Sequence, residues 1–246
     1  MSKSDLFATQ ASFYRDFRPT YPAALFDWLA AEAPARGLAW DCACGSGQAT
    51  LDLATRFERV IATDSSVPQL EQAELRPNIE YRCEPAEASS IAAGTVDLTL
   101  VAQALHWFDH PAFFAEVRRV SRPGALFAAV TYNLLSVSPA LDAVIADLYW
   151  RTLAGCWAPE RRHVEEGYRS IAMPFEAVAA PPFELEATWS YAQLTGYLHS
   201  WSAVATYRKR NGTDPVPALE PALAAAWGDA AERTVRFPLS VLAGRV

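Results

Sequence analysis

The sequence has no uninterrupted apolar stretch near the roughly 18 residues that a membrane-spanning helix needs, although 51% of its 246 residues are hydrophobic. Its first residues, 1–5, also lack the apolar centre of a signal peptide. These two absences lead us to expect a cytoplasmic protein that does not enter a membrane. The apolar content is enough for a sizeable core, and the length requires no more than one domain.

An excess of positive charge is missing as well. Lysine and arginine number 21 against 28 aspartate and glutamate residues, so the formal net charge is −7. Because a phosphate backbone is bound by a basic face, we expect no nucleic acid among the partners of this protein.

Cysteine is scarce, and no two cysteines have the C-x-x-C spacing that zinc sites often use. The four cysteines are Cys42, Cys44, Cys83 and Cys156. We expect free thiols in a reducing compartment and no bound metal.

From residue 37 to residue 132, short apolar runs alternate with segments of helical period, a pattern typical of strand and helix units on a mostly parallel sheet. We predict strands at 37–42, 59–64, 79–83, 96–102 and 125–130. After Tyr132 the alternation becomes irregular, and Ser138-Pro139 predicts the start of a helix. Two further strands are predicted at 183–191 and 233–239. The predicted fold class is α/β, with a doubly wound, Rossmann-like sheet of seven mostly parallel strands, helices on both faces and added helical segments.

The pair Gly45-x-Gly47 follows the first predicted strand directly and precedes a helix. Glycines there let the backbone come close to a nucleotide-like ligand, although a lone glycine pair is equally common in tight turns. Asp64 ends the second strand, 17 residues beyond Gly47, where its carboxylate can accept both hydroxyl protons of a ribose. The alternative is that Asp64 caps the helix that begins near Val67.

Two cofactors are compatible with this loop. A dinucleotide is typically bound by G-x-G-x-x-G, but Thr50 stands where the third glycine would be. Asp41 places a carboxylate just before the loop, which would repel a pyrophosphate and suits an amino group. S-adenosylmethionine carries a sulfonium and an ammonium and no phosphate, so electrostatics favour it over a nicotinamide dinucleotide.

Segment 41–47, with the sequence DCACGSG, resembles the D-x-G-x-G-x-G motif of class I S-adenosylmethionine-dependent methyltransferases. Segment 85–87 resembles the part of that family that meets the adenine, and segment 103–109 resembles a loop of the small-molecule group that includes trans-aconitate methyltransferase. The likeness spans nearly the whole chain, with further matches at Tyr14, 18–19, 21–22, 201–202, Tyr207 and 236–239. Ala43 departs from the motif, where the family has its first glycine. A methyl group is tolerated at this position if the backbone is extended, and it can also narrow the methionine end of the cofactor site.

The resemblance implies a single methyltransferase domain with four parts. Residues 1–36 would form an N-terminal lid and first helix, 37–132 the cofactor-binding half, 133–230 the helical additions on the substrate side, and 231–246 a C-terminal strand. It also implies S-adenosylhomocysteine as a product and the following cofactor-binding residues: Asp41, Ala43, Gly45, Gly47, Gln48, Asp64, Ser65, Gln69, Ala86, Glu87, Gln103 and Ala104.

The implied reaction is an in-line displacement on a small-molecule acceptor, in which the protein chiefly positions the reactants. A carboxylate acceptor is already ionised at neutral pH, whereas a phenol, thiol or amine needs a base, for which His106 is the candidate. His106 is equally well explained as a neutral histidine hydrogen-bonded between loops. The candidate substrate-binding residues are Tyr14, Arg18, Tyr21, Trp107, Trp201 and Tyr207.

Each of these substrate-side residues has a structural alternative, which is ordinary packing of the N-terminal lid for Tyr14 and Tyr21 and a place in the core for Trp107. Arg18 can hold a substrate carboxylate bidentately or form a surface ion pair. Trp201 and Tyr207 can line an acceptor pocket or attach the added helices to the core. A second hypothesis for the whole protein is an S-adenosylmethionine-binding module without catalysis that serves as a partner surface.

Overall fold

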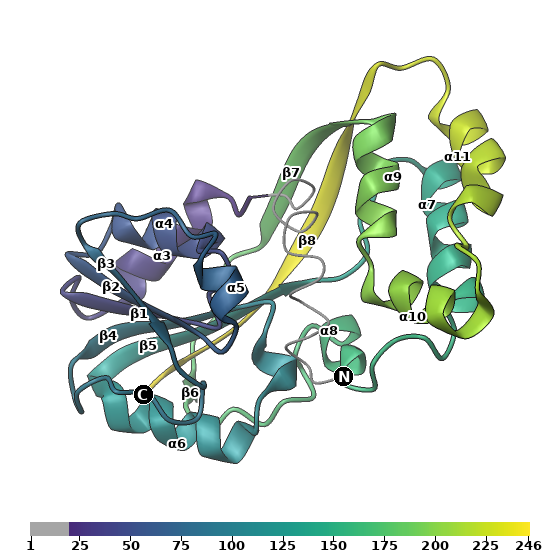
Figure 1. Ribbon diagram of the computed structural model, residues 1–246. Helices are drawn as coiled ribbons and strands as arrows, with labels where there is room; N and C mark the ends of the chain where they lie inside the picture. The colour runs from purple at the N-terminus through teal and green to yellow at the C-terminus, as the bar shows by residue number, and fades with distance from the viewer. Residues whose placement is uncertain (1–19) are drawn as a thin grey trace.

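The computed structural model describes residues 20–246, which form one mixed sheet with helices on both faces (Figure 1). The strand order is β3-β2-β1-β4-β5-β8-β6, and β7 also pairs with β8. Neighbours among β1 to β5 are parallel, whereas β8 is antiparallel to β5, β6 and β7. The strands are β1 Leu38–Cys42, β2 Arg59–Asp64, β3 Ile79–Cys83, β4 Val96–Ala102, β5 Ser121–Tyr132, β6 Glu176–Ala177, β7 Phe183–Ser190 and β8 Glu232–Arg245.

The sheet within residues 20–246 has eight strands where seven were expected, because β6 and β7 both pair with the same side of β8. Residues 239–245 of β8 pair with β5, and residues 232–239 pair with β7. The short β6 meets β8 only at 244–245. The last strand is therefore about twice as long as the predicted 233–239, since it joins two parts of the molecule.

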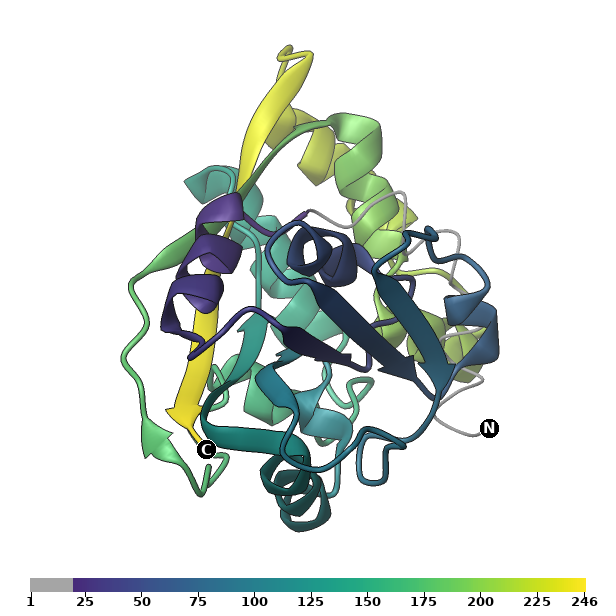
Figure 2. The same cartoon turned by 90° about the vertical axis from the view of Figure 1, so that its left-hand side faces the viewer.

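The helices of the first half cover both faces of the sheet (Figure 2). On one face, α3 and α4 pack through side chains such as Phe26 and Leu53. On the other face, α6 packs through Phe113, Val117 and Val120, the stripe expected from the sequence. These helices, with the short helices between them, are α3 Ala23–Glu32, α4 Gln48–Ala54, α5 Val67–Leu70, η1 Leu105–Trp107 and α6 His110–Val120.

Except for α8, whose Val164 packs into the core of the first half, the helical additions form a separate hydrophobic cluster beside the half of β8 that pairs with β7 (Figure 1). Ser138 caps the first of these helices by accepting a hydrogen bond from the Leu141 amide, as the Ser-Pro pair predicts. No helix within residues 20–246 is long and apolar enough to cross a membrane. The added helices are α7 Pro139–Asp147, the π-helical turn η2 Leu148–Thr152, α8 Arg161–Glu165, α9 Tyr191–His199, α10 Ser202–Asn211, η3 Pro217–Leu219 and α11 Glu220–Trp227.

Candidate functional site

A cavity of about 390 Å³ opens where the carboxyl ends of β1 to β4 meet. This is the edge of a parallel sheet at which α/β proteins bind ligands. The opposite wall comes from the helical additions, through residues of α8 and the segment from α9 to α10. The cavity therefore lies between the first half of the chain and the additions.

Most of the sequence-predicted site residues in the described range line this cavity. Gly47 and Tyr207 do not, and Tyr14 and Arg18 lie outside the described residues. Tyr207 packs instead against the hydrophobic cluster of the added helices, which is the structural alternative given for it above. The predicted residues that line the cavity are Tyr21, Asp41, Ala43, Gly45, Gln48, Asp64, Ser65, Gln69, Ala86, Glu87, Gln103, Ala104, His106, Trp107 and Trp201.

Asp41 is buried, and only one of its two carboxyl oxygens is hydrogen-bonded within residues 20–246. Its Oδ2 accepts a hydrogen bond of 2.5 Å from the Thr50 hydroxyl, while Oδ1 is buried without a hydrogen-bond partner among residues 20–246. Burial raises the pKa of Asp41 to about 7, and the nearby Asp64 adds to the increase while Thr50 opposes it. A ligand cation at Oδ1 would favour the ionised form and supply the missing partner.

The backbone of the loop after β1 is left-handed at three positions. Gly45 has φ +57° and Gly47 has φ +84°, and Ala43 between strand and glycines has φ +56°. The extended backbone, on which tolerance of the Ala43 methyl group was made to depend, is therefore absent. Ala43 instead has a left-handed backbone conformation, which costs L-residues roughly 1–2 kcal/mol.

Gly47 is required by packing within the protein. A Cβ at this position would lie 2.6 Å from the Tyr81 hydroxyl on β3, far inside van der Waals contact. The nearest obstacle to a side chain at Gly47 is thus Tyr81, whereas a Cβ at Gly45 would meet only Gln69 Oε1 at 3.9 Å.

Asp64 connects the loops that follow β1 and β2. Its Oδ2 accepts from the Gly45 amide at 2.8 Å, and its Oδ1 accepts from the Ser66 amide at 2.8 Å. The N-cap of α5 is Ser66, so the alternative reading of Asp64 as that cap does not hold. The Ser65 amide also hydrogen-bonds the Asp64 carboxylate, which still leaves it a lone pair. Since Asp64 lines the cavity, binding of a ribose hydroxyl stays a prediction.

The loop after β4 is also held in an unusual conformation. Gln103 has φ +59°, and its Oε1 accepts a 2.8 Å hydrogen bond from the Thr131 hydroxyl. Next along the loop, His106 is buried, with Nδ1 3.1 Å from the Tyr168 hydroxyl and its ring 4.7 Å from the Trp107 ring. His106 is thus hydrogen-bonded between two loops, as in the structural alternative given for it.

Arg161, at the start of α8, is a cavity residue that sequence reasoning missed. Its Nε donates to the Tyr149 hydroxyl at 2.9 Å and its Nη2 to Asn133 Oδ1 at 3.3 Å. The guanidinium lies over the Trp157 ring, 4.9 Å from the centroid. These partners are neutral, so no ion pair within the described residues cancels the charge of Arg161.

Charge is unevenly distributed over the cavity wall. Asp41, Asp64, Glu84 and Glu87 line the side formed by the strand ends. Arg161 is the only arginine or lysine among the described lining residues, and it comes from the opposite side. The arrangement suits a ligand with cationic and hydroxyl groups next to the strands and an anionic group next to the additions.

The Arg161 guanidinium lies over two aromatic rings, those of Tyr149 and Trp157, at 5.7 Å and 4.9 Å from the centroids. The rings of Trp157 and Trp201 are 5.6 Å apart, and the Tyr197 ring is 5.9 Å from that of Trp201. All three line the cavity. They form an aromatic part of the cavity wall that begins at Trp157, beside the half-buried Arg161.

Comparisons with known proteins agree with this geometry. A family model described as a methyltransferase domain matches residues 40–129. A Dictyostelium discoideum protein provisionally named a methyltransferase is 34% identical over 97% of this chain and 94% of its own length. A solved structure from Anaeromyxobacter dehalogenans, provisionally named a type II methyltransferase, is 51% identical with a TM-score of 0.88, covering 93% of this chain and 98% of that one. A methyltransferase-like structure from Bacillus halodurans, 17% identical over 91% of this chain and 97% of its own, shares the fold with a TM-score of 0.52.

Proposed function

The chain belongs to the class I S-adenosylmethionine-dependent methyltransferases, and from this premise we propose that its acceptor is a small molecule with a carboxylate group. The observation that carries the proposal is Arg161, an arginine without an ion pair among the described residues that lines the cavity opposite the acidic side chains. Arginine binds a carboxylate through two parallel N–H groups, which fixes both the position and the orientation of the carboxylate.

The residues at the strand ends fit S-adenosylmethionine. The unpartnered Oδ1 of Asp41 suits the ammonium group, and the lone pairs of Asp64 suit ribose hydroxyls. Ser66, which the sequence interpretation did not include, adds at the same wall a buried hydroxyl that has no hydrogen-bond partner within residues 20–246. No lysine or arginine from β1 to β3 and their loops lines the cavity, in keeping with a cofactor that carries no phosphate.

When bound, S-adenosylmethionine supplies a methyl group activated by the sulfonium. Asp41 and Asp64 would hold the cofactor, and Arg161 would hold the acceptor so that a carboxylate oxygen could take the methyl group while the sulfur leaves with the electron pair of the carbon–sulfur bond. No proton is transferred, because the carboxylate is ionised at neutral pH. Arg161 holds the acceptor, and the aromatic side chains Trp157 and Trp201 exclude water, so that positioning supplies the catalysis.

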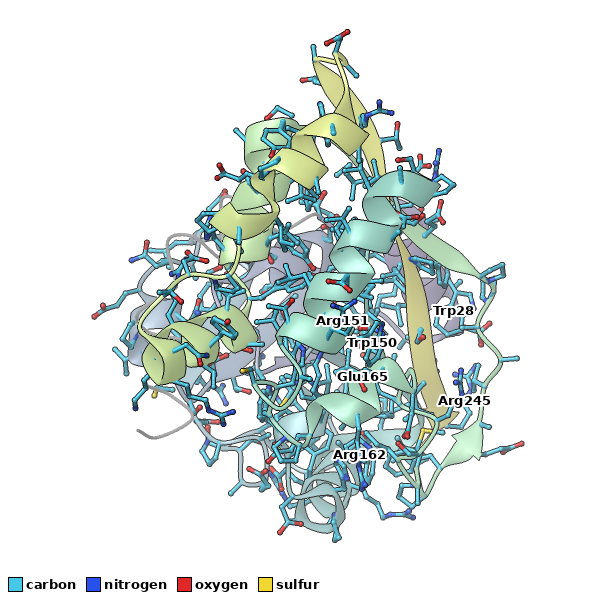
Figure 3. The ribbon with its side chains drawn as sticks, turned by 90° about the vertical axis from the view of Figure 1, so that its right-hand side faces the viewer. Trp28, Trp150, Arg151, Arg162, Glu165 and Arg245 are labelled. Atoms are coloured by element: carbon cyan, nitrogen blue, oxygen red, sulfur yellow. The ribbon has the colours of Figure 1, made fainter. Side chains whose placement is uncertain are left out.

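Calorimetry and a panel of acceptors test this proposal. Titration with S-adenosylhomocysteine should give binding, and methyl transfer should be seen with carboxylic acids rather than with phenols, thiols or amines. Arg161→Gln should raise KM for the acid at least tenfold, because a charge-assisted bidentate contact is lost. Arg162 is the matched control: it is the next residue of α8, is exposed and does not line the cavity (Figure 3).

The outcomes separate the alternatives. Arg162→Gln should leave KM unchanged, and equal effects of the two substitutions would contradict the role of Arg161. Transfer to a phenol, thiol or amine alone would overturn the carboxylate proposal. Binding of S-adenosylhomocysteine without transfer to any member of the panel would favour the non-catalytic module.

The remaining sequence expectations accompany this proposal. We propose that the whole chain is one methyltransferase domain with the four parts given above, and that its acceptor chemistry is like that of the trans-aconitate group. Its cytoplasmic location stays a prediction.

A further inference from the structure

We propose that Tyr149 is a positioning residue for the acceptor: its hydroxyl lies between the Arg161 guanidinium and the Glu165 carboxylate and prevents a direct ion pair that would occupy Arg161. The separation of the two charges follows from contacts within the protein. Its effect on the acceptor rests on the proposed function.

Arg161 and Glu165 have the spacing of an ion pair but do not form one. Glu165, which Figure 3 labels, ends α8 and follows Arg161 by four positions. Side chains at this spacing are neighbours on a helix, and opposite charges there attract each other. Within residues 20–246, however, Arg161 forms no ion pair with Glu165 or with any other carboxylate.

The Tyr149 hydroxyl bridges the two charged groups instead. Its oxygen accepts from Arg161 Nε at 2.9 Å, and its proton is donated to Glu165 Oε1 at 2.7 Å. The chemistry of the groups fixes both directions, because Nε of arginine can only donate and the phenol has a single proton. Burial raises the pKa of Tyr149 to about 12, although Arg161 opposes the increase, so the phenol keeps that proton at neutral pH.

Tyr149 is held in place by its surroundings. It is 1% exposed and lies in the π-helical turn η2, a rare conformation that is often found at functional sites. Its ring packs on that of Trp157, with 4.5 Å between the centroids, and its carbonyl accepts from the Trp157 indole at 3.3 Å. The hydroxyl therefore has a fixed place between the two charges.

This arrangement leaves part of the guanidinium for a ligand. Nε is used by Tyr149 and one proton of Nη2 by Asn133, whereas Nη1 forms no hydrogen bond within the described residues. Since Arg161 lines the cavity, Nη1 and the second proton of Nη2 are available for bidentate binding of a carboxylate. Direct contact with Glu165 would bring a competing carboxylate to the same guanidinium.

A crystal structure of Tyr149→Phe tests the separation without any acceptor. Phenylalanine keeps the buried ring, so the variant should fold, which circular dichroism checks. We expect a Glu165 carboxylate oxygen to move into direct hydrogen-bond contact with the Arg161 guanidinium. A Glu165 that stays apart from Arg161 in this variant would overturn the proposal. That result would not depend on the acceptor, so it is distinct from failure of the proposed function.

Kinetics with a carboxylic acid test the effect on the acceptor. Tyr149→Phe should raise KM by about fivefold or more and leave kcat within about twofold, because the acceptor then competes with an intramolecular carboxylate. In a Glu165→Gln background, Tyr149→Phe should raise KM by less than about twofold, because glutamine carries no charge. In an Arg161→Gln background, Tyr149→Phe should likewise have little further effect, since the group through which it acts is absent.

Tyr191→Phe is the matched control for the loss of a phenol hydroxyl. The Tyr191 hydroxyl donates to the Glu220 carbonyl, and its ring packs against the same hydrophobic cluster without lining the cavity, so KM should not change. An unchanged KM in Tyr149→Phe would contradict the proposal. So would an equal rise in KM with and without Glu165, because a merely structural role of the hydroxyl does not depend on the charge of Glu165.

Discussion

Ala43→Gly tests how the strained loop after β1 limits the protein. Ala43 has φ +56°, lies in the cavity wall and follows a fully buried strand. The left-handed conformation costs an alanine roughly 1–2 kcal/mol, and glycine removes that cost. Glycine also makes the unfolded chain more flexible, which reduces the gain in the free energy of unfolding by about 0.4–1 kcal/mol.

The net expectation is a gain of about 0.5–1 kcal/mol in the free energy of unfolding. For a chain of this length, 1 kcal/mol corresponds to roughly 2–4 °C in Tm, so Tm should rise by about 1–4 °C. Because the strain is present with and without ligand, most of this gain does not appear in binding. Removal of one methyl group from the cavity wall should still tighten S-adenosylhomocysteine binding, by less than about tenfold.

Scanning calorimetry and titration calorimetry measure the two quantities. Ala115→Gly is the matched control, because it makes the same chemical change at an exposed position inside α6 that does not line the cavity, where glycine costs about 1 kcal/mol. The two variants should therefore shift Tm in opposite directions. A Tm for Ala43→Gly at or below that of the wild type would refute the strain argument, and unchanged or weaker binding would refute the argument about the cavity wall.

The other predictions concern neighbouring groups. Gly47→Ala should lower the free energy of unfolding by more than about 1 kcal/mol, because its Cβ would lie 2.6 Å from the Tyr81 hydroxyl; adding Tyr81→Phe should restore part of the loss in denaturant titrations. Burial raises the pKa of Asp41 from 3.8 to about 7 in the folded protein, so the unfolded state loses this proton first and the ligand-free protein should lose stability between about pH 4 and pH 7. Asp41→Asn should remove this slope and weaken cofactor binding, and an unchanged slope in pH-dependent melting would contradict the assignment. Arg161→Gln should raise KM for a carboxylic acid, because a charge-assisted bidentate contact is lost.

The first half of the fold could be predicted from the sequence because its central strands are almost wholly apolar. β2, β3 and β4 have the predicted bounds, and β1 differs by one residue. The strand ends then place Asp41 and Asp64 at one edge of the sheet. Because the carboxyl ends of parallel strands meet at one edge of a sheet, the sequence pattern and the family resemblance were enough to predict the cofactor side of the site.

The acceptor side depends on contacts that no local pattern records. Arg161 belongs to a five-residue helix in an irregular segment, and only the folded chain brings it to the cavity beside Trp157. Tyr168 reaches His106 across 62 positions of sequence. The length of β8 was also missed, because its second half acquires a partner only when β5 is in place.

β8 has a consequence for how the acceptor wall can change during evolution. The strand pairs with the central sheet through 239–245 and with β7 through 232–239, and β7 leads directly into α9, which carries Tyr197. The distance between the strand-end wall of the cavity and the wall formed by α9 is thus set by the hydrogen-bond register of β8, which lies away from the reacting groups. A shift of one residue in that register would turn every side chain of the strand to the opposite face. New acceptors can therefore be accommodated by exchanging side chains on α8 and α9 while the spacing between cofactor and acceptor is inherited unchanged.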